Sequence, residues 1–333
     1  MRTEPRAERW NTGRLLRVVR AMADRASSAA YRREARAFAV TWGSAAVVGL
    51  VPGLGSGCTV PMATSSRAEI RAIERVPYTD HLGADRVALR AGAAGGARLV
   101  YVHGSPSDAT AFADQLVDPV PGFESISIDR PGYGSAADTG SVGDFGEQAR
   151  ALEPWLELRG GVGPILVGHS LGGPIIARAA ADYPDRVGGL VIVAGSLDPA
   201  LEKPRWFNHL ASIGAVRWLL PSMLRVSNDE MLAAPSETRT LGPLLERVTC
   251  PVIIVHGTRD GLVPYENVAY MQRAFTNAAS VEVITLEGQG HFLVWNTPGK
   301  AAIREAIGRL ARTLGIEPVR DPAASGGNAD RNR

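Results

Sequence analysis

The chain has 333 residues, of which 45% are hydrophobic and 21% charged, so it can bury the core of an ordinary globular enzyme. The formal net charge of +2 is too small to indicate a nucleic-acid partner. The only cysteines, Cys58 and Cys250, form neither a disulfide framework nor a C-x-x-C metal spacing, which excludes both classes of small cysteine-rich module.

The amino-terminal segment combines a basic stretch with an apolar one. Residues 1–36 hold ten arginines against four acidic residues, and residues 37–57 carry no charge. About 20 apolar residues are enough to cross a bilayer, and the preceding arginines would keep the amino terminus cytoplasmic. We therefore predict that residues 37–58 are a membrane anchor or export signal. The protein would then be membrane-associated or exported, as in a bacterial inner membrane or periplasm.

Two alternatives remain for this segment. Residues 54–58, Leu-Gly-Ser-Gly-Cys, resemble a bacterial lipoprotein cleavage site, in which Cys58 would carry the lipid. The match is imperfect because Leu54 lies four residues before the cysteine instead of three. The other alternative is a flexible apolar leader with no specific role, which would leave the protein in the cytoplasm.

From about residue 84, short β-rich runs alternate with longer helical patterns, and this predicts an α/β fold with a mostly parallel central sheet covered by helices on both faces. We predict one such domain over residues 68–318 and a disordered tail over residues 319–333. The predicted strands are 87–90, 98–102, 125–128, 165–167, 190–193, 252–255 and 281–284, and the predicted helices are 144–158, 171–182, 265–276 and 298–314.

One interval interrupts this alternation. Residues 197–247 occupy a position where a short crossover would be expected, yet they run for about 50 residues with several apolar and aromatic positions. We predict a small helical lid inserted there. Its aromatic residues either line a pocket for a hydrophobic substrate or simply pack the lid onto the sheet.

The strongest functional motif is Gly-His-Ser-Leu-Gly at residues 168–172, between a predicted strand and a predicted helix. A nucleophilic serine projects from such a tight strand-to-helix turn, and the residues two before and two after it must be very small. Ser170 is therefore the predicted nucleophile, and Gly168 and Gly172 form its elbow. In a chain with 37 glycines the motif could arise by chance, but its position between a strand and a helix argues against that.

A second motif, His-Gly-Ser-Pro at residues 103–106, follows the predicted strand 98–102. A tetrahedral intermediate needs two donors aimed at its oxyanion, and we predict the backbone N–H groups of Ser105 and Leu171. His103 is more simply interpreted as a residue that braces this turn through hydrogen bonds.

Two further residues complete the predicted triad. Asp260 follows the predicted strand 252–255, where a carboxylate can orient an imidazole, and His291 lies on a glycine-containing loop before the last helix. Each alone could be an ordinary turn or loop residue. Their order along the chain, Ser170, Asp260 and His291, is the order that elbow enzymes use.

With these motifs, residues 84–315 resemble the α/β-hydrolase superfamily, through HGSP, DRPGYG, GHSLGG, HGTRDGLVP and GQGHF. The resemblance implies an α/β-hydrolase fold with a lid at residues 197–247 and a structural role for Asp129. Some members take their acid from after the sixth strand, and Asp198 occupies that position here. We favour Asp260 because of its strand-end turn and motif.

The expected activity is hydrolysis of a carboxylic ester through an acyl-enzyme, with a small or hydrophobic ester as the partner and neither metal nor cofactor. Cofactor-free haloperoxidases, lactonases and carbon–carbon bond hydrolases share the serine triad and remain alternatives. A non-catalytic, membrane-tethered binding protein of the same fold is another. A dinucleotide enzyme is disfavoured because no G-x-G-x-x-G follows a first strand.

Overall fold

The computed structural model describes residues 64–316. The predicted basic segment 1–36, the anchor or signal at 37–58 with Cys58, and the tail 319–333 lie outside these residues. Within residues 64–316, no helix combines the length and the hydrophobicity that a membrane crossing requires.

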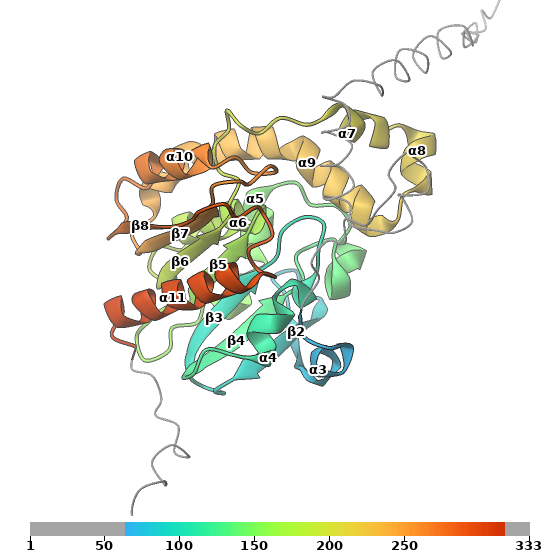
Figure 1. Cartoon of the computed structure of the whole chain (residues 1–333). Helices are drawn as coiled ribbons and strands as arrows, with labels where there is room; N and C mark the ends of the chain where they lie inside the picture. Colours follow the sequence, from blue (N-terminus) through green and yellow to red (C-terminus); the bar gives the residue numbers. More distant parts are fainter. Residues whose placement is uncertain (1–63, 317–333) are drawn as a thin grey trace, which may run out of the picture. The chain divides into compact units, whose positions relative to one another are not determined.

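The described residues form one eight-stranded sheet with the order β1-β2-β4-β3-β5-β6-β7-β8 (Figure 1). The pairs β1–β2 and β2–β4 are antiparallel, and the remaining pairs are parallel. The strands are β1 (Glu74–Thr79), β2 (Asp85–Gly92), β3 (Ala97–Val102), β4 (Phe123–Ile128), β5 (Ile165–His169), β6 (Gly189–Val193), β7 (Val252–Gly257) and β8 (Val281–Leu286). The predicted mostly parallel sheet is confirmed.

Helices cover both faces of this sheet (Figure 1). On one face, α5, α6 and α10 pack into a core cluster with β3, β5, β6 and β7, and on the other face α4 and α11 do the same. The helices of the sheet domain are α3 (Arg67–Ala72), α4 (Ala113–Val117), α5 (Phe145–Arg150), α6 (Gly172–Asp182), α10 (Glu266–Ala274) and α11 (Thr297–Thr313), with 3-10 turns at η2 (Ala109–Phe112), η3 (Gly134–Thr139) and η4 (Glu153–Trp155).

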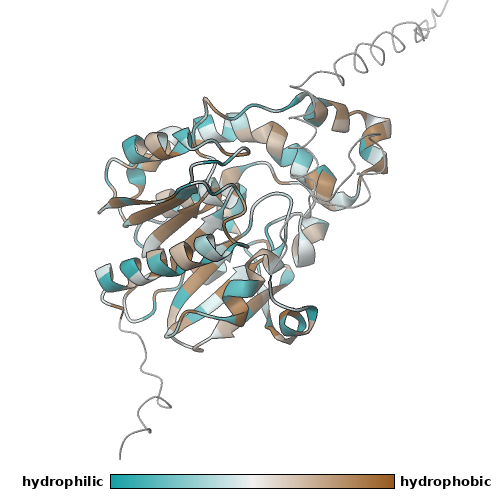
Figure 2. Cartoon of the chain, viewed as in Figure 1, coloured by the Kyte–Doolittle hydropathy of each residue, from teal (hydrophilic) through white to brown (hydrophobic). Residues whose placement is uncertain are grey.

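Burial explains the strand pattern. Every residue of β4, β5, β6 and β7 is buried, and the continuous apolar runs of β5, β6 and β7 are the signature of strands covered on both faces. Strand β4 instead buries Glu124, Ser125 and Ser127 between its apolar residues. Figure 2 shows the same contrast, with hydrophobic strands inside and helices whose colour alternates between hydrophilic and hydrophobic. The hydrophobic effect of burying these runs therefore places the sheet at the centre.

Two elements differ from the prediction. Strand β1 was not expected, because its sequence is polar and half exposed, as suits an edge strand that pairs only with β2 and contains Pro77. The helix predicted over 144–158 ends at Arg150 and continues as the 3-10 turn η4, which contains Pro154.

The segment predicted as a lid forms three helices, α7 (Trp206–Ala211), α8 (Gly214–Leu219) and α9 (Ser222–Leu241), followed by the 3-10 turn η5 (Gly242–Arg247). Helix α9 is the longest of them and contributes buried residues along most of its length. Figure 1 shows it running across one end of the domain, with α7 and α8 beyond it.

Candidate active site

Ser170 lies at a sharp turn between β5 and α6. Its backbone has φ of 54°, in the left-handed region that non-glycine residues rarely adopt, and such strain is common where a side chain must be aimed. The turn is anchored on both sides: the Ser170 amide donates to the Val193 carbonyl at 2.9 Å, and the Gly173 amide donates to the Ser170 carbonyl at 2.9 Å. The hydroxyl is therefore presented by a turn that the sheet holds in place.

The elbow glycines meet a steric need that the structure makes explicit. A Cβ on Gly168 would lie 2.4 Å from the carbonyl oxygen of Gly172, so strand and helix approach too closely for any side chain there. A Cβ on Gly172 would lie 2.3 Å from the carbonyl oxygen of Val102. The second glycine thus makes room for β3, a neighbour that the prediction did not identify.

Asp260 and His291 are joined by a hydrogen bond, with His291 Nδ1 2.8 Å from Asp260 Oδ2. Because a carboxylate only accepts, Nδ1 carries the proton and Nε2 is left as the base. The other oxygen of Asp260 accepts from the amides of Leu262 at 2.9 Å and Val263 at 2.8 Å. Burial alone would raise the pKa of Asp260, but His291 and these amides outweigh it, and the pKa lies below its usual value.

The imidazole of His291 lies beside the elbow. Its ring packs against the ring of His169, the residue before Ser170, with centroids 4.9 Å apart. The structure therefore joins the predicted acid to the predicted base and places that base beside the residue that precedes the predicted nucleophile.

Asp198, the alternative acid, is engaged elsewhere. Its carboxylate accepts from the Ala200 amide at 2.9 Å, and its own amide donates to Asn267 at 2.8 Å. Among residues 64–316, the carboxylate hydrogen-bonded to His291 is that of Asp260. Of the two candidates, the geometry therefore favours Asp260.

The predicted oxyanion donors flank Ser170. A Cβ on Gly104 would lie 2.9 Å from the Cβ of Ser170, so the loop after β3 touches the nucleophile. Within the described chain, the amides of Ser105 and Leu171 donate to no backbone or side-chain acceptor, although amides buried away from water are normally paired. Two free donors beside a nucleophile are what an oxyanion hole requires.

His103 braces this loop, as predicted. It is fully buried; its Nε2 accepts from the Arg130 amide at 3.1 Å, and its Nδ1 donates to the Gly104 carbonyl at 2.7 Å. Burial and the nearby Arg130 charge hold the pKa of His103 well below its usual value, so the ring stays neutral. Asp129 also has a structural role, since its carboxylate accepts from the amides of Ala109 and Ser135.

Two further histidines, which the sequence analysis did not single out, support the triad. His169 Nε2 donates to the His291 carbonyl at 3.1 Å, and His256 Nε2 donates to the Val263 carbonyl at 3.0 Å. They thereby hold the loop of the base and the turn of the acid. Their positions inside GHSLGG and HGTRDGLVP were visible, but a supporting role leaves no sequence signal of its own.

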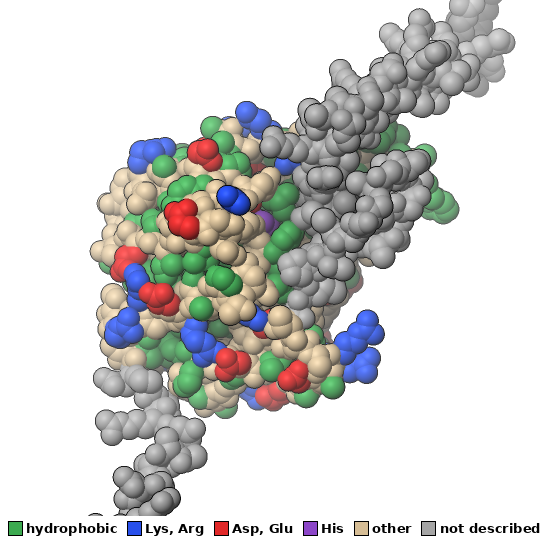
Figure 3. All heavy atoms as spheres, viewed as in Figure 1, with side chains coloured by type: hydrophobic (Ala, Val, Ile, Leu, Met, Phe, Trp, Pro, Cys, Tyr) green, Lys and Arg blue, Asp and Glu red, His purple; other side chains and the backbone are tan. Residues whose placement is uncertain are grey.

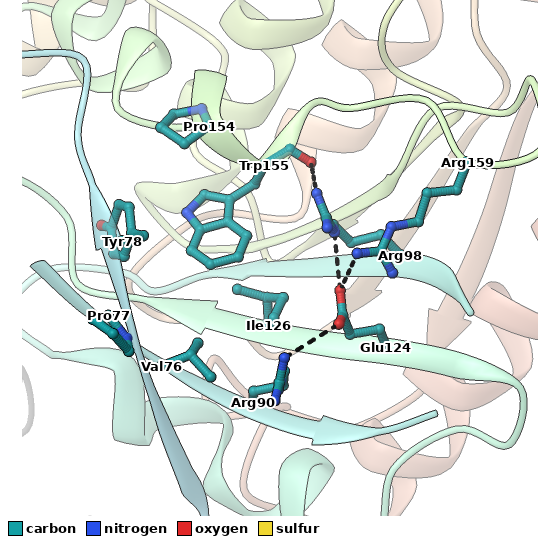
Figure 4. Close-up of a pocket in the computed structure, with 10 residues that line it drawn as sticks. All are labelled: Val76, Pro77, Tyr78, Arg90, Arg98, Glu124, Ile126, Pro154, Trp155 and Arg159. Atoms are coloured by element: carbon teal, nitrogen blue, oxygen red, sulfur yellow. Dashed lines mark hydrogen bonds and ion pairs between the residues drawn. The ribbon is translucent and has the colours of Figure 1, made fainter. Parts of the chain in front are cut away.

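A cavity of about 270 Å³ lies away from this site (Figure 4). Three guanidinium groups, from Arg90, Arg98 and Arg159, converge there on the buried carboxylate of Glu124. Arg98 lies at the start of β3, whereas His103 follows its end, so the cavity is at the opposite end of the strand from the oxyanion loop. Glu74 and Glu157, outside the lining, supply further carboxylates to Arg90 and Arg98, and we assign the cavity no role in catalysis.

Charged side chains of both signs are interspersed over the face of the molecule seen in Figure 3. A basic stripe of the kind that tracks a nucleic-acid backbone is not visible on the described part of that face. This agrees with the small net charge of the chain.

Comparisons with known proteins agree with this geometry. The chain is 38% identical over 244 residues to a 2-hydroxy-6-oxononadienedioate/2-hydroxy-6-oxononatrienedioate hydrolase of Burkholderia vietnamiensis, a match that covers 60% of this chain and 83% of the relative. It is 27% identical over 249 residues to a non-heme chloroperoxidase of Streptomyces lividans, a match that covers 61% of this chain and 88% of the relative. The solved structure of the monoacylglycerol lipase of Paleococcus ferrophilus shares the fold, with a TM-score of 0.53 and 19% identity. The match covers 74% of this chain and 99% of that structure.

The model of the alpha/beta hydrolase family matches residues 99–305, which include the elbow, the oxyanion loop, Asp260 and His291. The mostly parallel sheet with helices on both faces and a small helical lid is the fold that the resemblance implied. The chain belongs to the alpha/beta hydrolase family.

Proposed function

We propose that the protein is a serine hydrolase that cleaves a carboxylic ester, with Ser170 as nucleophile, His291 as general base and acid, and Asp260 as the carboxylate that orients His291. The observation that carries this proposal is the combination of a left-handed Ser170 with the Asp260–His291 hydrogen bond of 2.8 Å. Strain at a serine, a paired imidazole and two unpaired amides together support an active site at this turn.

The proposed reaction has two steps, formation of an acyl-enzyme and its hydrolysis. Ser170 Oγ forms a bond to the acyl carbon while its proton passes to His291 Nε2, and the carbonyl π pair moves onto oxygen. The amides of Ser105 and Leu171 bind that oxyanion. The intermediate collapses to an acyl-enzyme as the alkoxide leaves with the proton from His291, and water then repeats the attack to release the acid and restore Ser170.

An ester is the proposed substrate because its cleavage needs only groups that these residues supply: a nucleophile, two oxyanion donors and a proton for the leaving oxygen. The lid contains buried apolar side chains, including Phe207, Leu224 and Val226. We propose a small or hydrophobic acyl group because ligand sites are mostly lined by apolar side chains. A lactone is an internal ester and would follow the same steps.

Carbon–carbon bond hydrolysis is the second candidate. The observation that favours it is the 38% identity to a hydrolase whose name describes a hydroxy-oxo-dienedioate substrate. In that reaction the leaving group is a carbon, so a proton must reach carbon as the bond breaks. The non-heme chloroperoxidase among the relatives leaves haloperoxidase chemistry as a further alternative.

A turnover panel on the full chain separates these candidates. We expect p-nitrophenyl esters with acyl chains of two to twelve carbons to be hydrolysed and a vinylogous 1,5-diketone acid to be cleaved much more slowly, with both activities lost in Ser170→Ala. Faster cleavage of the diketone would replace the ester proposal with the carbon–carbon one. No turnover of either, with no active-site labelling, would indicate a binding protein.

A further inference from the structure

A buried carboxylate on the lid helix α9 meets the oxyanion loop directly. Glu230 is almost fully buried, and its Oε2 lies 2.6 Å from Ser105 Oγ and 2.6 Å from the Tyr133 hydroxyl. Its Oε1 accepts from Arg130 Nη1 at 2.5 Å and from Gln148 Nε2 at 2.9 Å. Helix α9 therefore places a charge against the same residue whose amide is a proposed oxyanion donor.

Arg130 extends this contact to the backbone of the loop. The guanidinium is buried and donates from Nε to the His103 carbonyl at 2.9 Å and from Nη2 to the Gly104 carbonyl at 2.9 Å. The Gly104 carbonyl and the Ser105 amide belong to one planar trans peptide, so they point in opposite directions. A donor that fixes the carbonyl thereby fixes the direction of the Ser105 N–H.

The hydrogen bonds to this peptide also affect its strength as a donor. The Gly104 carbonyl accepts from both Arg130 and His103, and hydrogen bonds to a carbonyl polarise the N–H of the same peptide. Glu230 keeps Arg130 in position, while its second oxygen holds the Ser105 side chain. The peptide is thus held at its carbonyl and at the adjacent side chain.

A role for Glu230 in stabilising the lid alone explains these contacts less well than a role in positioning the oxyanion loop. Buried ion pairs are often no more stable than apolar side chains of the same size, because removing both charges from water is costly. Helix α9 also carries the neighbouring Asp229, which pairs with Arg217 of α8 at the surface and reaches no part of the oxyanion loop among the described residues. Among the described residues of α9, Glu230 is the carboxylate that reaches the loop, and Ser227 adds a neutral contact, accepting from Ser105 Oγ at 3.0 Å.

We propose that Glu230 is a positioning residue for the oxyanion hole. It acts through Arg130 and Ser105 to set the direction of the Ser105 N–H, so that the seating of α9 and the assembly of the hole are coupled. This inference rests on the proposed function, because it assigns a task to the lid in the same reaction.

The test compares Glu230→Gln with Asp229→Asn in the full chain. Both change a carboxylate to an amide on adjacent positions of α9, but only the first reaches the loop. For Glu230→Gln we expect kcat to fall about 10- to 100-fold, less than the roughly 10²- to 10³-fold loss on deleting a whole oxyanion donor. KM should stay within about threefold, and Asp229→Asn should match wild type.

A trifluoromethyl ketone distinguishes positioning from folding. Ser170 adds to its carbonyl carbon and the proton passes to His291, which leaves an oxyanion in the hole. The inhibition constant of this ketone should rise in Glu230→Gln by the same factor by which kcat/KM falls, since both quantities depend on how well the hole binds an oxyanion.

Because Glu230→Gln leaves the buried Arg130 charge without its partner, this variant could fail to fold. Ser105→Ala keeps the ion pair and the Ser105 amide but removes the contacts of the Ser105 hydroxyl with Glu230, Tyr133 and Ser227. We expect it to fold and to show a smaller loss, equal in kcat/KM and in the inhibition constant. The inference is overturned if the variants that fold keep the wild-type inhibition constant or if Glu230→Gln equals Asp229→Asn. If wild type neither turns over an ester nor binds the ketone, the proposed function fails first and this inference falls with it.

Discussion

The Nε2 atom of His169 lies 3.1 Å from the carbonyl oxygen of His291, so the residue before the nucleophile holds the loop that carries the base. The two rings also pack together at 4.9 Å. The nucleophile and the base come from loops 121 positions apart, and this contact fixes one against the other. The contact therefore ties the loop of the proposed base to the elbow of the proposed nucleophile.

His169→Phe tests this link. Phenylalanine keeps a flat ring beside His291 but removes the donor, so the buried His291 carbonyl loses its partner at a cost of about 1–3 kcal/mol in unfolding free energy. We expect kcat to fall about tenfold with little change in KM, because misplacement of the base affects the chemical step. Unchanged kcat in steady-state ester hydrolysis would show that the loop does not need this support.

Asp260→Asn and Asp198→Asn test the assignment of the acid. The amide at position 260 can no longer hold His291 with its proton on Nδ1, and kcat should fall by about 10³- to 10⁴-fold. Asp198→Asn should stay within about twofold of wild type, because its carboxylate bonds only a neighbouring amide among the described residues. A larger loss in Asp198→Asn than in Asp260→Asn would reverse the assignment.

The stability of the fold should decrease as the pH falls below about 6.5. Burial lowers the pKa of His169 to about 3 and also lowers those of His103 and His256. The unfolded chain binds a proton at His169 near pH 6.5 while the folded chain keeps this ring neutral down to about pH 3, so this group costs about 1.4 kcal/mol of unfolding free energy per pH unit between these values. The lowered pKa values of His103 and His256 act in the same direction.

Urea unfolding at pH 7, 6 and 5 measures this slope. His169→Phe removes the His169 contribution and should reduce the slope by about 1.4 kcal/mol per pH unit, even if its stability at pH 7 is lower. A wild-type stability that does not change between pH 7 and 5 would contradict the neutral state of these buried rings.

Gly168→Ala and Gly214→Ala test the close packing at the elbow. A Cβ at position 168 would meet a backbone oxygen at 2.4 Å, whereas a Cβ at position 214, in the lid, meets nothing within 4 Å. We expect Gly168→Ala to lose about 1–3 kcal/mol or more and to reduce kcat by shifting Ser170, while Gly214→Ala stays within about 0.5 kcal/mol. Thermal unfolding and ester turnover measure both, and equal effects of the two changes would argue against a packed elbow.

The sequence predicted most of the sheet because its inner strands are buried on both faces and therefore read as continuous apolar runs. Strand β1 left no such signal, since an edge strand half exposed to water needs neither a continuous nor a clearly alternating apolar pattern. The end of α5 at Arg150 was also missed, because apolar residues continue from Ala151 to Leu156. The structure places these residues in and around the 3-10 turn η4.

The triad residues could be predicted because glycine-rich turns at strand ends are local features of the chain. The role of Glu230 could not be predicted, because the residues around its carboxylate lie about a hundred positions or more away in the sequence. They are Arg130, Tyr133 and Ser105. In an amphipathic helix, an acidic residue is normally expected to face water. Only the folded arrangement shows that this one faces the oxyanion loop.

The central claim is that Ser170 is a nucleophile activated by His291. The most direct measurement is labelling of the full chain with a fluorophosphonate, followed by mass mapping of the modified peptide. We predict a single adduct on Ser170, none in Ser170→Ala, and labelling slowed at least about a hundredfold in His291→Ala. An adduct on another residue, or labelling of Ser170 that is equally fast without His291, would contradict the claim.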